Sequence, residues 1–266
     1  MDKKYVIGLD YGTDSVRALL VDAENGAEVA CAVSLYKRWA EGKYCDPEKS
    51  QFRQHPLDYI EGMEESIKEI VAQVSPAVVA NILAITIDTT GSTPGAVDEK
   101  GTPLALTPGF EEDPDAMFVL WKDHTALKEA DDINALAKQW GVDYTKYSGG
   151  LYSSEWFWSK ILHITKKEGA VAQNAFSWME HCDWMPAFLT GNDNVLTVKR
   201  SRCAAGHKAM WHEEFNGLPS QEFLGSLHPN LAGLRDRLYH DTYTTDEMVG
   251  NISAVWAQKL GLPESV

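Results

Sequence analysis

A stretch near the N-terminus constrains the fold most strongly, because it holds two short apolar runs separated by a polar turn. The run Tyr5–Leu9 contains β-branched residues and predicts a buried strand, which we expect Asp10 to end. Val16–Val21 is apolar again and predicts a second strand that contains Arg17. Gly12 lies between the runs, and a residue without a Cβ adopts a positive φ at little cost. The stretch therefore predicts a β-hairpin with a tight turn.

The turn of this hairpin combines a carboxylate with a glycine and hydroxyl groups, at Asp10, Gly12, Thr13 and Ser15. Backbone N–H groups and hydroxyls in a tight turn can surround phosphate oxygens. A carboxylate beside them can hold Mg²⁺, usually through its waters. The turn is therefore a candidate phosphate site. An ordinary hairpin with a polar turn fits the same residues equally well, since short motifs also occur by chance.

The charge balance limits the classes of partner. The chain has 266 residues, with 24 Lys and Arg against 39 Asp and Glu, which gives a net charge of −15. Nucleic acids and anionic membranes both require a basic surface, so we expect neither as a partner, although a local basic site for a nucleotide stays open. No apolar run approaches the roughly 20 residues that a membrane helix needs.

Cysteine usage indicates the compartment. We expect no secretory leader, because the first residues, Met-Asp-Lys-Lys-Tyr, are charged and lead directly into a predicted strand, and the sequence contains no CxxC pair. We therefore expect a reduced, cytoplasmic protein. The four cysteines are widely scattered, at Cys31, Cys45, Cys182 and Cys203.

Apolar periodicity predicts further elements, with no repeat and no clean linker, so we expect one domain with insertions. Asn25-Gly26 predicts a two-residue hairpin turn before a strand over Ala27–Leu35. Pro56 begins a helix that should fade by Ser75, and Ile82–Ile87 predicts a buried strand. The other expected elements are a helix over Pro76–Ala80, a strand over Ala96–Asp98, helices over His124–Trp140, Trp156–Lys167 and Phe176–Leu189, a short strand over Asp193–Leu196, a helix over Ser220–Leu224, a polar loop to Tyr243 and a helix over Ala254–Leu260.

Three features outside the turn are candidates for a ligand pocket. Asp88–Gly95 is a run of small and polar residues at a predicted strand end, where loops commonly carry function. Trp121 follows an apolar run and could form the wall of a polyol pocket, and Lys208 stands among small residues that leave room for a ligand. The simpler interpretation is a long turn, a packing tryptophan and a solvated lysine.

The N-terminal hairpin resembles the first phosphate motif of the actin-like ATPases. Its form Gly-Leu-Asp-Tyr-Gly-Thr-Asp-Ser-Val-Arg-Ala is most similar to that of the FGGY carbohydrate kinases. Val119–Asp123 resembles the Leu-Trp-x-Asp segment of that family, and Glu180–Trp184 with Leu189-Thr190-Gly191 resembles its Glu-x-x-Asp-aromatic…Leu-Thr-Gly helix. Asp88–Pro94 together with Leu120–His124 is most similar to the ribulokinase branch.

This resemblance implies an α/β fold, namely an actin-like ATPase (ribonuclease-H-like) domain with a mixed sheet flanked by helices, over residues 1–266. It implies transfer of the γ-phosphoryl group of ATP to the terminal hydroxyl of a ketopentose, which is L-ribulose in the ribulokinase branch. Such catalysis is mainly positioning plus charge stabilisation. The resemblance implies that Asp10 lies near Mg²⁺ and binds it through water. It places Gly12, Thr13, Ser15 and Arg17 along the phosphates of ATP, and the Ala96 backbone, Trp121, Glu155 and Lys208 at the sugar.

The sequence departs from the family pattern at its C-terminal end. FGGY kinases continue beyond the position of Val266 into a second actin-like domain, which carries the catalytic-base aspartate and the adenosine site. We therefore expect the N-terminal, sugar-binding half of a kinase, inactive alone and self-associating through its apolar interdomain surface. Two alternatives stay open. One is an FGGY kinase for xylulose, ribitol or glycerol, and the other is a non-catalytic actin-like module that retains the phosphate loop.

Overall fold

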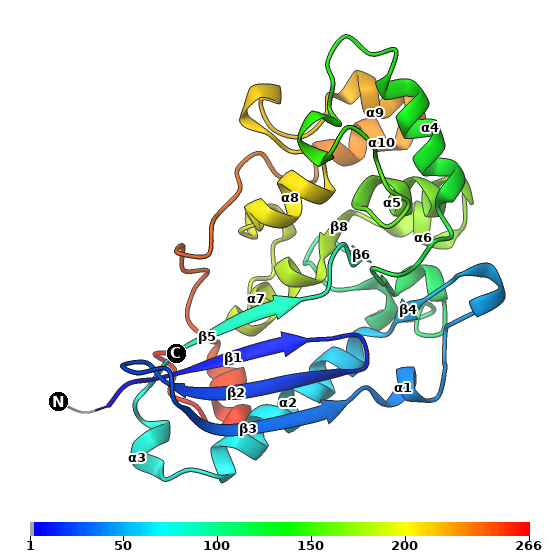
Figure 1. The fold of residues 1–266 in the computed structure, drawn as a ribbon. Helices are drawn as coiled ribbons and strands as arrows, with labels where there is room; N and C mark the ends of the chain where they lie inside the picture. Colours follow the sequence, from blue (N-terminus) through cyan, green and yellow to red (C-terminus); the bar gives the residue numbers. More distant parts are fainter. Residues whose placement is uncertain (1–2) are drawn as a thin grey trace.

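A computed structural model describes residues 3–266 (Figure 1). The strands are β1 (Tyr5–Tyr11), β2 (Ser15–Asp22), β3 (Glu28–Leu35), β4 (Arg53–Gln54), β5 (Ile82–Thr89), β6 (Pro94–Val97), β7 (Phe118–Val119) and β8 (Ser177–Glu180). The helices are α1 (Lys37–Ala40), α2 (Pro56–Ala72), α3 (Pro76–Val79), α4 (Leu127–Ala137), α5 (Phe157–Lys166), α6 (Ala170–Asn174), α7 (His181–Thr190), α8 (Arg202–Lys208), α9 (Gln221–Leu227), α10 (Pro229–Arg235) and α11 (Ala254–Leu260).

The main sheet has the strand order β3-β2-β1-β5 and is mixed, because β1 pairs antiparallel with β2 and parallel with β5. Side chains alternate across its two faces, as strand geometry requires. On β1, Ile7 and Leu9 are buried against the helical layer, whereas Asp10 is exposed on the opposite, open face. Figure 1 shows α2 and α11 on the covered side of the sheet. The mixed sheet with flanking helices confirms the predicted fold class.

Helix α2 forms the main cover of the sheet. Pro56 occupies its first turn, where the missing N–H of proline removes no helical hydrogen bond, and the His55 ring accepts from Leu57 N–H at 3.1 Å. Tyr59, Met63, Ile67 and Ile70 recur along one side and are buried. Gly62 permits the close approach to β2, since a Cβ there would lie 2.8 Å from Val16 Cγ1.

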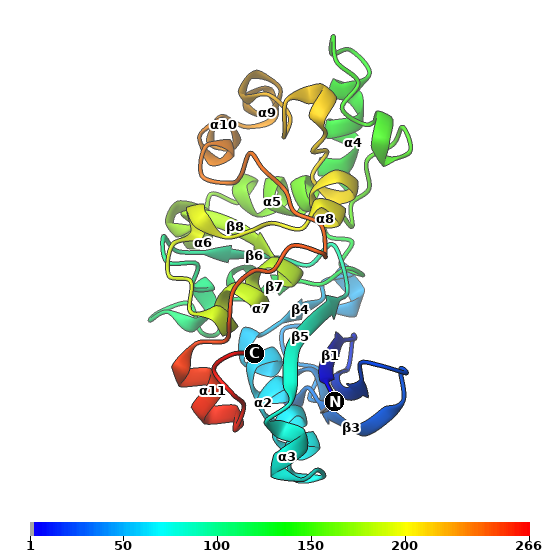
Figure 2. The ribbon, with the colours of Figure 1, turned by 90° about the vertical axis from the view of Figure 1, so that its left-hand side faces the viewer.

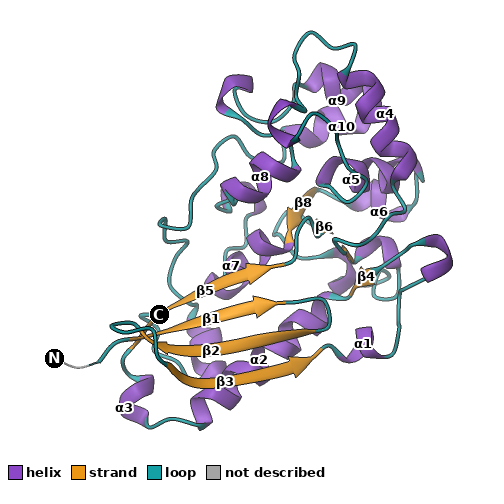
Figure 3. Cartoon of the chain, viewed as in Figure 1, coloured by secondary structure: helices purple, strands orange, loops and turns teal. Residues whose placement is uncertain are grey.

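The rest of the chain builds a second, mostly helical part around its own core (Figure 3). Its core residues come from α4, α5, α9 and α10, including Trp158, Ile161 and Phe223. Two small antiparallel sheets, β6-β8 and β4-β7, lie where this part meets the main sheet. In the view of Figure 2 they lie between β5 below and α5 above. The loops that follow β5 and β7 therefore come together at this junction.

Three local predictions about the first two hairpins were wrong. Strand β1 continues two residues beyond Leu9 to Tyr11, so Asp10 does not end it. Gly12 does not adopt a positive φ, because the turn is closed by its N–H donating to Ser15 O at 2.9 Å. The second turn has four residues rather than two, since Asp22 N–H donates to Ala27 O. Gly26 in that turn does adopt a positive φ, of 74°.

The later predictions were wrong where tertiary contacts decide between helix and strand. Residues 177–180 form strand β8, paired with β6, and the helix begins only at His181. The expected strand over Asp193–Leu196 is a short 3₁₀ turn, and helix α10 lies within the predicted polar loop. Strand β5 is at the sheet edge, where Leu83 is 49% exposed, so it is not buried in this chain.

Across residues 3–266, no helix is both long enough and apolar enough to cross a membrane.

Candidate functional site

A polar hollow lies on the open face of the main sheet. Strand register places Asp10 opposite Arg17 on β2 and opposite Asp88 on β5. These side chains line a hollow of about 220 Å³ together with Gly8 and Thr86. A Cβ at Gly8 would meet no atom within 4 Å, so the floor of the hollow has free space. Two carboxylates and a guanidinium thus share one exposed site, in reach of a phosphate chain and a hard cation.

The turn beside this hollow is held from several directions. Thr13 O accepts from Gln54 Nε2 at 2.6 Å, and Asp14 Oδ1 accepts from Trp39 Nε1 at 2.6 Å. The Asp14 carbonyl also accepts from Tyr36 N–H at 3.0 Å. Within the turn, Gly12 and Ser15 are half-buried, so part of each stays accessible. The turn is therefore positioned by its surroundings before any ligand binds.

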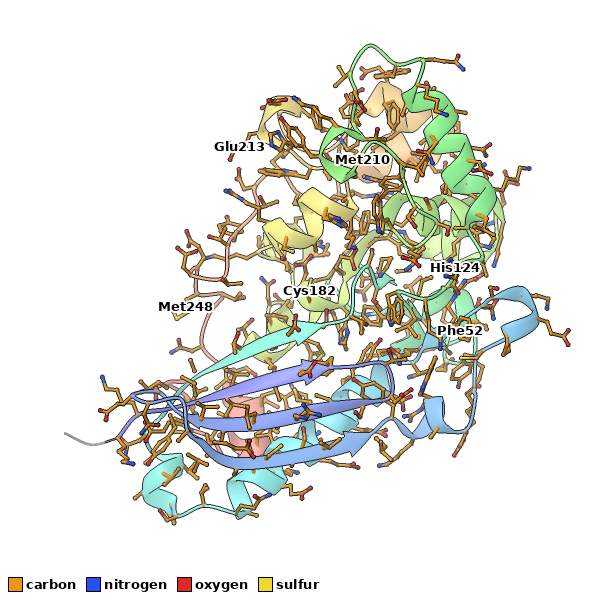
Figure 4. All side chains as sticks on the ribbon, in the orientation of Figure 1. Phe52, His124, Cys182, Met210, Glu213 and Met248 are labelled. Atoms are coloured by element: carbon orange, nitrogen blue, oxygen red, sulfur yellow. The ribbon has the colours of Figure 1, made fainter. Side chains whose placement is uncertain are left out.

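Trp121 joins the candidate sugar site to this turn. Its indole Nε1–H donates to Thr13 Oγ1 at 3.0 Å, and its side chain remains 38% exposed. Lys122, the next residue, places Nζ 4.5 Å from the ring centre of Phe52 (Figure 4). The structure thus brings together Thr13 and Trp121, two predicted site residues that are far apart in the sequence. An indole face next to a hydroxyl-rich turn can pack against a polyol and orient it toward a phosphate.

Glu155 and Lys208 lie in the helical part of the molecule. Glu155 Oε1 is 3.4 Å from Nε2 of His124, which directly follows the Trp121 segment (residues 118–123). Lys208 is half-buried at the end of α8, with Nζ 5.3 Å from the Trp156 ring centre. Trp156 thus links the two residues, as the immediate neighbour of Glu155. Among the described residues, no hydrogen bond or ion pair joins either of them to Trp121 or to the turn.

Ala96 has a different environment from the other predicted site residues. It lies in β6 opposite Trp178 and is fully buried in the core of the helical part. Its exposed fraction is 0%, so neither its side chain nor its backbone offers a surface to a ligand in this chain. The structure therefore does not support a sugar contact at Ala96.

Buried charged groups support the loops around Trp121. Asp123 and Glu180 lie in segments that carry the family resemblance, whereas Arg53 and Lys160 were not selected from the sequence. Arg53 and Asp123 form an ion pair with no exposed side-chain surface, and Asp123 also accepts from Phe52 N–H at 2.7 Å. Lys160 donates to backbone carbonyls, and Glu180 accepts from Thr93 N–H at 2.7 Å. Burial lowers the pKa of Lys160 and raises the pKa of Glu180. The available signal was a lysine inside an apolar helical run.

Asp88 also belongs to the site, although only its loop was selected from the sequence. The sequence pattern indicated only a polar residue at a strand end. Parallel pairing of β5 with β1 places Asp88 beside Asp10. A larger hollow of about 520 Å³ lies along the outer edge of β5, against α7 and residues 243–252. None of the predicted site residues lines that hollow. The smaller hollow, which is lined by Asp10, Arg17 and Asp88, is therefore the better candidate for the functional site.

Comparison with known proteins gives matches over nearly the whole chain. The family described as "FGGY family of carbohydrate kinases, N-terminal domain" matches residues 5–266. The ribulokinase of Vibrio parahaemolyticus is 52% identical over 265 residues, which cover 99% of this chain and 47% of that protein. The ribulokinase of Shouchella clausii is 37% identical over 268 residues, covering 98% and 46%. The chain thus spans about half the length of the curated relatives it matches.

Solved structures share the fold. Ligand-bound xylulose kinase from Lactobacillus acidophilus superposes with a TM-score of 0.74 at 18% identity, covering 99% of this chain and 46% of that one. At such identity the likeness shows the fold alone, and this fold is the one that the family resemblance implied. With the family match extending over nearly the whole length, the chain belongs to the FGGY family of carbohydrate kinases and corresponds to the N-terminal domain of its members.

Proposed function

We propose that this chain is the sugar-binding half of an ATP-dependent ribulokinase, which converts L-ribulose to L-ribulose 5-phosphate. The observation that carries the proposal is the hydrogen bond from Trp121 to Thr13, because it puts a candidate sugar contact at a candidate phosphate turn. Two relatives that match nearly the whole chain are named ribulokinases, which supports this sugar over xylulose, ribitol or glycerol. A non-catalytic actin-like module would not need an exposed tryptophan there.

The turn and hollow supply the phosphate side of the proposed reaction. Gly12, Thr13 and Ser15 lie along the phosphates of ATP, where an N–H group and hydroxyls can donate to phosphate oxygens. Arg17 is exposed beside Asp10 and offsets negative charge on the transferred group. The donor set fits Mg²⁺, which prefers carboxylate and water oxygens, and Asp10 would hold it through water. The ion would supply charge neutralisation at the phosphates.

Trp121, Lys208 and Glu155 supply the sugar side. Trp121 packs a ring face against the carbon chain of the ketose. The ammonium group of Lys208 donates to the sugar hydroxyl oxygens, and the carboxylate of Glu155 accepts from the sugar hydroxyls. Ala96 receives no role, because it is fully buried. The half-buried position of Lys208 leaves its ammonium group able to reach a ligand.

We further propose that this chain binds sugar but does not turn it over alone. The proposed catalytic base is an aspartate of the second family domain, so phosphoryl transfer requires both halves. Mixing the purified chain with Mg-ATP and L-ribulose should therefore give no sugar phosphate. Formation of L-ribulose 5-phosphate by the chain alone would contradict this part of the proposal.

Calorimetric titration of L-ribulose, and then of D-xylulose, ribitol and glycerol, tests the proposed substrate. L-Ribulose should saturate one site with the highest affinity. Trp121→Ala and Lys208→Met should weaken its binding at least tenfold, which corresponds to about 1.4 kcal/mol. Lys138→Met removes an exposed lysine of the helical part and serves as the matched control. Preference for another polyol would replace L-ribulose as the substrate, and ATP-dependent polymers without sugar binding would favour the non-catalytic module.

A further inference from the structure

Lys160 is a buried cation in the middle of α5. Its Nζ donates to the carbonyl oxygens of Ser92 at 2.6 Å, Leu120 at 2.9 Å and Val119 at 3.3 Å. An ammonium group has three N–H bonds and no acceptor, so these three carbonyls use all of them. The residue is only 1% exposed and so makes no contact with solvent or substrate through its charged group.

The three carbonyls belong to two separate loops. Ser92 lies in the loop that follows β5 and Asp88, whereas Val119 and Leu120 lead directly into Trp121. Helix α5 packs against β6, at the point where both loops leave the small sheets (Figure 2). A single side chain therefore sets the spacing between the loop after the phosphate hollow and the main chain of the candidate sugar contact.

Glu180 holds the first of these loops from its other side. One carboxylate oxygen accepts from Thr93 N–H at 2.7 Å, and the other pairs with the Ser92 hydroxyl. Ser92 is thus fixed between a buried acid and Lys160. Lys160 thereby ties the main chain before Trp121 to this fixed loop, and the indole reaches Thr13 from there.

We propose that Lys160 is a positioning residue for sugar binding, which aligns Trp121 with the phosphate turn by joining the Ser92 and Leu120 carbonyls. This inference rests on the proposed function. A purely structural role predicts a loss of stability alone, because removing one member of a buried ionic network leaves its partners without a counter-charge. A positioning role predicts, in addition, lower sugar affinity and a looser Trp121–Thr13 hydrogen bond in protein that stays folded.

The test compares Lys160→Met with the unmodified chain in two assays. In the ligand-free arm, the indole N–H resonance of Trp121 is assigned by its loss in Trp121→Phe, and its hydrogen exchange is measured. We expect exchange at least tenfold faster in Lys160→Met, because the Thr13 bond is no longer held in alignment. In the ligand arm, L-ribulose affinity should fall at least tenfold, while Mg-ATP affinity stays within twofold.

Two further variants keep the test decisive. Lys166→Met removes another lysine of α5, one that pairs with Asp132, and should leave both assays unchanged. If Lys160→Met does not fold, Lys160→Gln retains an N–H₂ donor and should show a smaller change in the same direction. Unchanged indole exchange in a folded variant would overturn the inference. If the unmodified chain binds no sugar while indole exchange still increases, the proposed function fails and the alignment by Lys160 stands.

Discussion

The phosphate turn and the Trp121 segment meet at one hydrogen bond but are built in different ways. The turn, residues 12–15, joins two adjacent strands and is closed by its own backbone, while Trp39 and Gln54 add neutral hydrogen bonds from outside it. The Trp121 segment, residues 118–123, depends on Arg53 and Lys160, which come from distant parts of the chain. One half of the candidate site is thus local structure, and the other half is held by buried charge.

This difference teaches where the site is vulnerable. A local turn loses little when one contact is removed, because neighbouring backbone bonds remain. A segment held by buried ions loses more, because each removed partner leaves an uncompensated charge in a site without water. Substitutions of equal size in the two regions should therefore have unequal effects.

The largest effect is expected at Asp123. Its carboxylate pairs with Arg53 and accepts from Phe52 N–H, and neither ionic side chain is exposed. Asp123→Leu should lower the free energy of unfolding by about 3–5 kcal/mol, because the guanidinium stays buried without its partner. Urea unfolding measures this. Adding Arg53→Met should recover part of the loss, and a double variant no more stable than Asp123→Leu would refute the role of the ion pair.

His181 should make stability depend on pH at the boundary of the two regions. Its ring lies 4.8 Å from Tyr11, which precedes the turn, and 5.5 Å from Phe118, which begins the Trp121 segment. Within residues 3–266 neither ring nitrogen has a hydrogen-bond partner, and burial lowers the pKa of His181 to about 3. The unfolded chain therefore takes up a proton below pH 6.5 while the folded chain does not.

Stability should consequently fall as the pH decreases, by roughly 2 kcal/mol between pH 8 and pH 5 from this residue. The measurement is urea unfolding across that range for the unmodified chain and for His181→Phe, which keeps the ring without a titrating group. The difference between the two curves isolates the histidine from the carboxylates. Parallel curves would show that His181 takes up a proton in the folded chain as readily as in the unfolded chain, and would contradict the lowered pKa.

The same contrast explains how much the sequence could predict. The first hairpin could be predicted because its two strands, which contain Tyr5–Leu9 and Val16–Val21, pair with each other and are close in the sequence. The strand at residues 177–180 could not be predicted, because a short apolar run is compatible with both helix and strand. Its pairing with β6, which is distant in the sequence, decides for a strand. The Thr13–Trp121 bond spans 108 positions, and no spacing rule reaches that far. Resemblance to a family selected Trp121, but only the fold shows what its indole donates to.

The open face of the sheet should cause self-association, an effect of intermediate size. Val33 and Leu35 on β3 are 48% and 66% exposed on the side that carries Arg17. Burying such side chains between two copies is favourable, so the chain should form dimers at high concentration. Sedimentation equilibrium should show dimerisation weakened about tenfold by Val33→Lys with Leu35→Lys, or roughly 1.4 kcal/mol.

A matched control places the same change elsewhere. Val255 on α11 is 73% exposed and lies away from the open face, so Val255→Lys should leave the dimerisation constant unchanged. A dimerisation constant that changes only with the β3 substitutions would assign the association to the open face of the sheet. A monodisperse monomer at every concentration would refute the association, and an equal effect of Val255→Lys would assign it to net charge.

The smallest effect is expected within the phosphate turn itself, at Asp14. Its carboxylate accepts from Trp39 Nε1 at 2.6 Å in an exposed setting, while its backbone carbonyl accepts independently from Tyr36 N–H. Asp14→Ala removes only the first contact, so unfolding should become easier by about 0.5–1 kcal/mol, the net value of one accessible hydrogen bond. Asp14→Asn retains an acceptor oxygen and should recover most of this loss in the same urea experiment. A loss as large as that of Asp123→Leu would mean that the turn depends on its hydrogen bond with Trp39 as strongly as residues 118–123 depend on their buried ion pair, and the contrast between the two halves of the site would then be wrong.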